Sequence, residues 1–465
     1  MIRQGILVFE DTVQGAEAID TRVAALSLLD RDIRTLERVG IEQLLVVVPD
    51  DGSPTLTPLT QRLDMHIEFA TWEALAAAAF FPSEDFLLLL GDYAHHHSSL
   101  GDLLAGSIET GDLVVQTALS PLQDGPFFEV SRAAQTLVFS ETETPVGQVS
   151  SGAFLCTADL FSAFELAGGG EDVHAFLQSR IHNRSASMRP TEPPLWRRVG
   201  DHHSARAAKN MLFAQVTKKT SGFISRHLNA RISIPTSKLL IETGISPHMV
   251  TVLLVLTTGL AAAWLMTRAE EYAYLALAGT LWQFAAIFDR CDGEIARVKL
   301  CESKFGAWFD TVTDNIAYIC AGIGLIIGVH RRNPETTLYV YLGISAICAL
   351  LLTLVILYNY ARKTGSGSLQ HYLRELVLNV PSRQRNLGQQ LMARLGFLAK
   401  RDCFSFIIFL AALADQLEFV YGYFIVLLHL AALGVLISQS KMLRAHTHSA
   451  ATQTPAPTAQ PQERR

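Results

Sequence analysis

FDRCDGEIARVKLCESKFGAWFDTVTD, residues 288–314, is the stretch on which the interpretation of this sequence depends. Four aspartates, Asp289, Asp292, Asp310 and Asp314, lie inside or beside long apolar runs. An unpaired charge in such a setting costs several kcal/mol and is usually there for function. The stretch therefore predicts a functional site in a membrane protein.

The spacing of the four aspartates predicts that they meet. Asp289 and Asp292 are three residues apart, and Asp310 and Asp314 are four apart, so each pair shares one face of a helix. Two facing helices would bring the four carboxylates together. Four carboxylates cannot all ionise at close range without cations, and oxygen ligands suit Mg²⁺, Mn²⁺ or Ca²⁺ better than zinc.

Residues with small side chains accompany the acids. Gly293, Ala296 and Gly306 leave room between the two helices for a flat or phosphate-bearing ligand. Arg297 adds a fixed cation that suits a phosphate oxygen. The alternative is a set of buried ion pairs, but Arg290 and Arg297 alone are too few to neutralise four acids.

Written with its spacing, the stretch is Asp289-x2-Asp292-Gly293-x2-Ala296-Arg297-x8-Gly306-x3-Asp310-x3-Asp314. It resembles the signature of the CDP-alcohol phosphatidyltransferase family, with every position filled. This integral-membrane family moves a phosphoalcohol group from a CDP-linked donor to an acceptor hydroxyl and releases CMP. The resemblance implies that the four aspartates hold two Mg²⁺ or Mn²⁺ ions on the donor pyrophosphate and that Asp314 is the general base. It also implies a cytidine and phosphate site lined by Gly293, Ala296, Arg297 and Gly306.

Composition separates two unlike halves. The 465 residues leave room for two or three domains, and residues 249–438 hold most of the long apolar runs. A net charge of -6 gives no sign of nucleic-acid binding. The six cysteines form no CxxC pair, so we expect small apolar residues in a reducing compartment rather than disulfides or a zinc site.

Residues 1–200 alternate strand-like and helix-like runs, which predicts a cytoplasmic α/β domain with a largely parallel sheet. The expected strands are Gly5–Phe9, Leu44–Val48, His66–Phe69, Phe86–Leu90, Leu113–Gln116 and Ala153–Cys156. The arrangement resembles nucleotidyltransferases of the sugar-phosphate type, and LLLLGDY resembles their strand that ends in a metal-binding aspartate, here Asp92.

The first domain departs from those enzymes after its first strand. They have a glycine-rich loop there, whose backbone N–H groups hold the triphosphate. This chain has Glu10 and Asp11, which would repel phosphate. We therefore expect the domain to have lost nucleotidyl transfer and to serve docking, regulation or stability. The run His95–His97 is expected in a solvated loop rather than at a metal site.

The remaining chain predicts a membrane domain. Residues 201–247 read as a basic amphipathic linker in the headgroup layer, 248–440 as six spans and 441–465 as a disordered tail. The expected all-α spans are 249–267, 273–291, 305–329, 337–360, 401–416 and 419–438. The connection 361–402 is expected to be cytoplasmic and partly helical. Lys238 and Arg401 are possible ligands for an anionic acceptor.

Basic residues set the expected orientation. The linker before the first span and the connection after the fourth are both rich in Lys and Arg, so both should be cytoplasmic. Both termini then lie inside, and the acidic motif lies at the cytoplasmic surface. His330, Arg331 and Arg332 on the opposite side argue the other way.

The favoured function is a divalent-metal-dependent transferase of phospholipid biosynthesis, with CDP-diacylglycerol as donor. The two-domain order is similar to bifunctional inositol-1-phosphate cytidylyltransferase/di-inositol-phosphate phosphate synthases, which makes a CDP-inositol donor the alternative. A hypothesis of another class is a non-catalytic membrane scaffold. Gly322, Gly324 and Gly328 would permit close helix packing within the bundle or in a homodimer.

Overall fold

The computed structural model describes residues 2–49, 60, 63–106, 112–119, 127–133, 136–143, 145–182, 184–217, 222–364 and 400–451. The chain divides into two compact units. Unit 1 comprises Met1–Lys218, Ser237–Ile245 and Glu294–Cys301, and unit 2 comprises Lys219–Thr236, Ser246–Gly293 and Glu302–Arg465. The predicted connection 361–402 and tail 441–465 lie largely outside the described residues.

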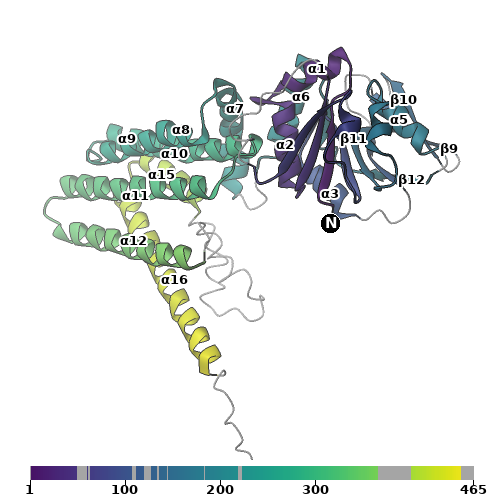
Figure 1. Cartoon of the computed structure of the whole chain (residues 1–465). Helices are drawn as coiled ribbons and strands as arrows, with labels where there is room; N and C mark the ends of the chain where they lie inside the picture. Colours follow the sequence, from purple (N-terminus) through teal and green to yellow (C-terminus); the bar gives the residue numbers. More distant parts are fainter. Residues whose placement is uncertain are drawn as a thin grey trace, which may run out of the picture. The chain divides into compact units, whose positions relative to one another are not determined.

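Short apolar runs form the strands of unit 1, which is mainly a sheet covered by helices (Figure 1). The strands are β1 (Gln4–Val8), β2 (Arg22–Val23), β3 (Leu26–Ser27), β4 (Gln43–Val48), β5 (His66–Thr71), β6 (Phe86–Leu90), β7 (Tyr93–His95), β8 (Leu113–Leu119), β9 (Phe127–Ala133), β10 (Thr136–Thr142), β11 (Gln148–Cys156), β12 (Ala186–Pro190) and β13 (Trp196–Arg198). The α-helices up to residue 214 are α1 (Val13–Asp20), α2 (Leu28–Arg38), α3 (His97–Ala105), α4 (Ala163–Ala167), α5 (Val173–Arg180) and α6 (His202–Ala214). A 3₁₀ turn, η2 (Leu75–Ala77), follows β5.

Nine strands form one sheet, in which β1 pairs in parallel with β4 and β6, and β4 pairs in parallel with β5. Strand β11 runs antiparallel to both β6 and β8, and the β9–β10 hairpin is antiparallel. The sheet is therefore mixed, and the expectation of a largely parallel sheet was wrong. The reason is local: β8 to β11 are connected through a hairpin rather than through a helical crossover, which parallel pairing requires.

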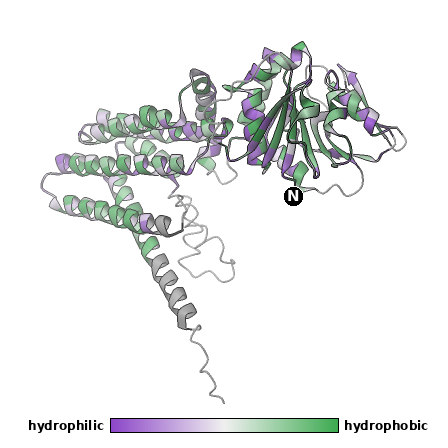
Figure 2. Ribbon diagram, in the orientation of Figure 1, coloured by the Kyte–Doolittle hydropathy of each residue, from purple (hydrophilic) through white to green (hydrophobic). Residues whose placement is uncertain are grey.

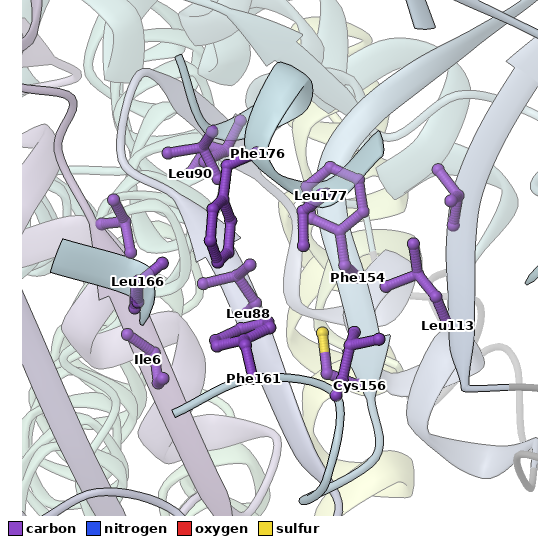
Figure 3. Packing of buried hydrophobic residues seen from close by; sticks show 14 of the residues in the cluster. Ile6, Leu88, Leu90, Leu113, Phe154, Cys156, Phe161, Leu166, Phe176 and Leu177 are labelled. Atoms are coloured by element: carbon purple, nitrogen blue, oxygen red, sulfur yellow. The ribbon is translucent and has the colours of Figure 1, made fainter. Parts of the chain in front are cut away.

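The core of unit 1 lies between the sheet and the helices that cover it. Ile6, Leu88 and Phe154 point from neighbouring strands toward Phe161 and Leu177 (Figure 3). All five residues of β6 are buried, which is typical of a central strand with both faces covered. Because these apolar runs are buried, the strands end near the polar residues that follow them.

Unit 2 is helical, and helix α10 contributes residues to both units. The elements from residue 225 onward are the π-helical η3 (Ser225–Asn229), α7 (Ala230–Leu240), the 3₁₀ turn η4 (Ile241–Thr243), α8 (Pro247–Val250), the π-helical η5 (Thr251–Leu256), α9 (Thr257–Met266), α10 (Tyr272–Val298), α11 (Lys304–Arg332), α12 (Thr337–Thr364), α15 (Arg401–Leu413) and α16 (Leu417–Ala451). Apolar residues cover most of the long helices (Figure 2). Helix α16 continues beyond residue 438, where the last span was expected to end.

Glycines bring two helices of unit 2 into close contact. A Cβ at Gly324 would collide with the carbonyl oxygen of Ala263, and one at Gly328 with that of Met266. Helix α11 therefore packs against α9 with backbone nearly touching backbone, as small residues allow in membranes. These two glycines serve packing within the bundle.

Among the described residues, four helical segments are long and apolar enough to cross a membrane. They are Pro247–Met266, Lys304–Arg332, Thr337–Ile356 and Leu417–Leu436, and they coincide with four of the six predicted spans. The other two predictions fall on α10 and α15. Helix α10 has charged residues in its last turns, and α15 has 13 residues, fewer than the roughly 20 that a perpendicular span needs.

Candidate active site

Three aspartates from two helices of unit 2 meet at one point. Asp289 lies on α10, and Asp310 and Asp314 lie one turn apart on α11. One carboxylate oxygen from each lies within 4.8 Å of the other two. Helix α11 begins at Lys304 because Ser303 caps it, accepting a hydrogen bond from the backbone N–H of Gly306. The i, i+4 spacing then presents both carboxylates on one face.

Arg401 at the start of α15 joins this cluster. Its Nη1 donates to Oδ1 of Asp289 at 2.6 Å and to Oδ1 of Asp314. The guanidinium carbon also lies 5.9 Å from the ring centre of Tyr318. Arg401 was expected only as a possible ligand for an anionic acceptor, and its pairing with the acids was not predicted, because it is 87 residues from Asp314 in the chain.

The cluster has unused capacity for a cation. Oδ1 of Asp310 is buried and has no hydrogen-bond partner within the described part of the chain. A buried acceptor of this kind needs a donor or an ion. Three carboxylates against one guanidinium leave an excess of negative charge, and an all-oxygen set suits Mg²⁺ or Mn²⁺. The residues present therefore fit the divalent ions that the motif implies.

Asp292, the fourth aspartate, makes different contacts. Its Oδ2 accepts a hydrogen bond from the Thr251 hydroxyl at 2.5 Å, and its Oδ1 accepts from the backbone N–H of Gly293. It is not one of the three residues whose ligand atoms converge. Thr251 belongs to η5, so the beginning of the first span orients this carboxylate.

The other predicted binding residues lie on the same two helices, apart from Lys238. Ala296 and Arg297 are in the last turns of α10, and Gly306 is in the first turn of α11. A Cβ at Gly306 would approach the His248 ring to 3.2 Å, so a larger side chain would crowd the segment before η5. Lys238 on α7 donates to Oδ1 of Asn210 at 2.6 Å.

Two buried arginines of unit 1 also escaped the sequence analysis. Arg31 donates to the carbonyl oxygens of Val298 at 3.0 Å and Val23 at 2.8 Å, and Arg34 donates to that of Lys299 at 2.9 Å. Val298 ends α10, so these bonds satisfy carbonyls that the end of a helix leaves without partners. Arginines on α2 thus hold the end of the helix that carries Asp289.

In unit 1, Asp92 does not offer a free carboxylate. Its Oδ2 accepts from Nε of Arg198 at 2.7 Å, and both side chains are mostly buried. Burial, with the charge of Asp92 nearby, raises the pKa of Glu10 to about 7. The expectation of a solvated loop at His95–His97 was wrong, because His95 is buried on β7 and Nδ1 of His96 caps α3.

The region that contains the acid cluster matches a known family. Residues 245–435 fit the family model described as CDP-alcohol phosphatidyltransferase. The protein is accordingly an enzyme that transfers a substituted phosphate group, as the motif predicted.

Relatives extend the match beyond that domain. The chain is 28% identical to a "Bifunctional IPC transferase and DIPP synthase" from Rubrobacter xylanophilus over 81% of this chain and 84% of the relative. It is 32% identical to a "Phosphatidylinositol phosphate synthase" from Mycobacterium bovis over 31% of this chain and 63% of the relative. The inositol-1-phosphate CTP transferase from T. maritima has 14% identity and a TM-score of 0.37, covering 45% of this chain and 95% of that structure. The predicted resemblance of the chain to these bifunctional enzymes is confirmed, because the match to the Rubrobacter relative extends over both halves of the chain.

Proposed function

We propose that this protein transfers a phosphatidyl group from CDP-diacylglycerol to the hydroxyl of an alcohol acceptor and releases CMP. The observation that carries the proposal is the convergence of Asp289, Asp310 and Asp314 in unit 2. Divalent ions bound there would supply charge stabilisation to the attacking and leaving oxygens of the transfer. Side chains of this protein would carry out the remaining steps.

Asp314 is proposed as the general base. It accepts the proton of the acceptor hydroxyl, whose oxygen forms a bond to the phosphorus that carries the diacylglycerol group. The bond from that phosphorus to the oxygen bridging it to CMP breaks, and CMP leaves with the electron pair. Arg401 is proposed to exchange its contacts with Asp289 and Asp314 for a phosphate oxygen of a substrate when cations occupy the carboxylates. Asp292, held by Thr251, is proposed as a fourth ligand, and Gly293, Ala296, Arg297 and Gly306 as the nucleotide site.

The donor is chosen from the chemistry of unit 1. A CDP-inositol donor would have to be made by this chain from CTP and an inositol phosphate, or be supplied ready-made. The carboxylate of Asp92 is paired with Arg198, and Glu10 stands in the loop after β1, which argues against triphosphate binding in unit 1. The name of the Rubrobacter relative keeps CDP-inositol as the second candidate.

The membrane arrangement is proposed with six spans, α10 and α15 included, and with both termini cytoplasmic. Two of the three basic residues that argued against this orientation, Arg331 and Arg332, have acidic partners. Arg332 makes a two-bonded ion pair with Asp415 at 3.0 and 3.1 Å, and Arg331 lies 3.7 Å from Glu270. Both arginines therefore form ion pairs within unit 2, and the larger number of Lys and Arg residues in 201–247 and 361–402 supports the proposed orientation.

The test is CMP release by the purified protein from CDP-diacylglycerol or CDP-inositol and a panel of alcohols, with and without Mg²⁺ or Mn²⁺. Release should require a metal and should fall by about 1,000-fold in Asp314→Asn. The exposed Glu335→Gln is the matched control and should keep full activity. Unchanged release by Asp314→Asn would remove Asp314 as the base, and release only from CDP-inositol would select the second candidate.

A further inference from the structure

Three potential metal ligands converge in unit 1, away from the aspartate motif in the sequence. Glu10 lies in the loop that follows β1, Asp172 is the N-cap of α5, and His174 is in the first turn of α5. One ligand atom from each lies within 4.8 Å of the other two. Residues separated by more than 160 positions thus offer two carboxylates and an imidazole to one point.

Backbone hydrogen bonds hold both carboxylates in place. Oε1 of Glu10 accepts from the N–H of Val173 at 3.2 Å, and Oδ1 of Asp172 accepts from the N–H of Ala175 at 2.9 Å. Each carboxylate uses one oxygen in this way, which leaves the second oxygen for a ligand. The loop itself is fixed to its surroundings, because the N–H of Asp11 donates to the carbonyl oxygen of Gly170 at 2.7 Å.

His174 is the observation that points to a ligand. Its side chain is 1% exposed, and Nδ1 has no hydrogen-bond partner within the described part of the chain. The imidazole ring stacks on the ring of Phe128, with the ring centres 3.6 Å apart, and makes T-shaped contacts with Phe139 and Phe154. These contacts fix the plane of the imidazole. Nε2 lies 3.4 Å from the hydroxyl oxygen of Ser150. The tautomer that donates from Nε2 to Ser150 leaves a lone pair on Nδ1, which is how metal-binding histidines are oriented.

We propose that Glu10, Asp172 and His174 bind a divalent transition-metal ion, of which Zn²⁺ is the best match. An imidazole nitrogen combined with two carboxylates suits zinc, whereas Mg²⁺ prefers oxygen ligands alone. Three protein ligands leave a fourth tetrahedral position for water or another small ligand. The bound ion would clamp the loop after β1 to the start of α5.

The charges around the site permit a cation. Arg198 is a cation near the site, with its guanidinium carbon 5.3 Å from the ring centre of Phe128, on which His174 stacks. It is already paired with Asp92 at 2.7 Å and lies 3.8 Å from Glu141. Its repulsion of a metal is therefore reduced by two acids, and the two carboxylates of the site outweigh it.

The experiment measures zinc bound to the full-length protein after chelator treatment and dialysis against Zn²⁺ or Mg²⁺, using elemental analysis. The Asp310→Asn/Asp314→Asn double variant serves as background, because it weakens metal binding at the aspartate cluster. We expect one zinc per chain in this background and no retention of magnesium. Asp172→Asn and Glu10→Gln should each weaken zinc binding by more than about 100-fold, since even partners of metal ligands contribute 10- to 100-fold.

Glu171→Gln is the matched control, because it removes the same charge from an exposed neighbour that is not a ligand. It should bind zinc as the background does. Asn also caps helices, so Asp172→Asn should retain α5, and circular dichroism checks this. Equal zinc binding by Asp172→Asn and Glu171→Gln, in the background or in the otherwise unchanged protein, would overturn the proposal. Equal retention of Mg²⁺ and Zn²⁺ would overturn the choice of a transition metal.

Discussion

The two units hold charge away from water in different ways. In unit 2, Asp289, Asp310 and Asp314 share one guanidinium and keep an excess of negative charge at the cluster. In unit 1, helix α2 buries Arg31 against backbone carbonyls, and its neighbour Asp32 has no hydrogen-bond partner among the described residues. A buried charge held by backbone carbonyls is structural, whereas an excess of one sign calls for a mobile counter-ion.

The first prediction concerns the excess of negative charge at the aspartate cluster of unit 2. Asp310→Asn removes one carboxylate and should lower CMP release in Mg²⁺ by about 1,000-fold, because metal-held charge contributes several kcal/mol to such transfers. Raising Mn²⁺ should recover part of the activity. Kinetics at increasing metal concentration measure this. A variant with normal activity and normal metal dependence would show that the excess charge has no role in catalysis.

The second prediction concerns Arg401, which neutralises part of that cluster. Arg401→Met leaves Asp289 and Asp314 without their partner and should destabilise the chelator-treated protein by about 3 kcal/mol. Saturating Mn²⁺ should remove most of this loss, since cations replace the guanidinium. Thermal unfolding in detergent with EDTA or Mn²⁺ provides the measurement. The same loss in both conditions would mean that arginine and metal do not share the carboxylates.

The third prediction concerns the buried guanidinium of Arg31, which backbone carbonyls hold in unit 1. Arg31→Met keeps the volume but leaves the carbonyl oxygens of Val298 and Val23 unsatisfied, which should cost about 2 kcal/mol. Because Val298 ends the helix that carries Asp289, the KM for the CDP-linked donor should also rise. Arg22→Met, at an exposed position in the same region, is the control. A stable variant with unchanged kinetics would refute a structural role for Arg31.

The fourth and smallest effect is expected at Asp32. Burial holds the pKa of this carboxyl well above its ordinary value, so the folded state keeps a proton that the unfolded state releases above about pH 4. The sign of the linkage is that stability falls as the pH rises from there until the folded-state pKa is passed. Asp32→Asn should remove this dependence and stabilise the protein by about 1 kcal/mol at neutral pH. Melting curves across pH test it, and a variant less stable than the parent at neutral pH would show that Asp32 is ionised.

The sequence alone determined the catalytic half of this protein. The spacing of Asp289, Asp310 and Asp314 places them on two helix faces, and helical periodicity acts over a few residues, so the motif could be recognised without coordinates. The strands of unit 1 were found for the same local reason: an apolar run such as Phe86–Leu90 needs both faces covered.

Tertiary structure decided which distant residues meet these local patterns. Arg401 reaches the aspartates, Arg31 reaches the end of α10, and Asp172 with His174 reaches Glu10, across chain separations that no spacing rule covers. Strand β11 likewise lies antiparallel between β6 and β8 after the β9–β10 hairpin. The sheet as a whole decides which strands these elements pair with. Local periodicity fixes the direction of a side chain on its own element, but only packing brings its partner within hydrogen-bonding distance.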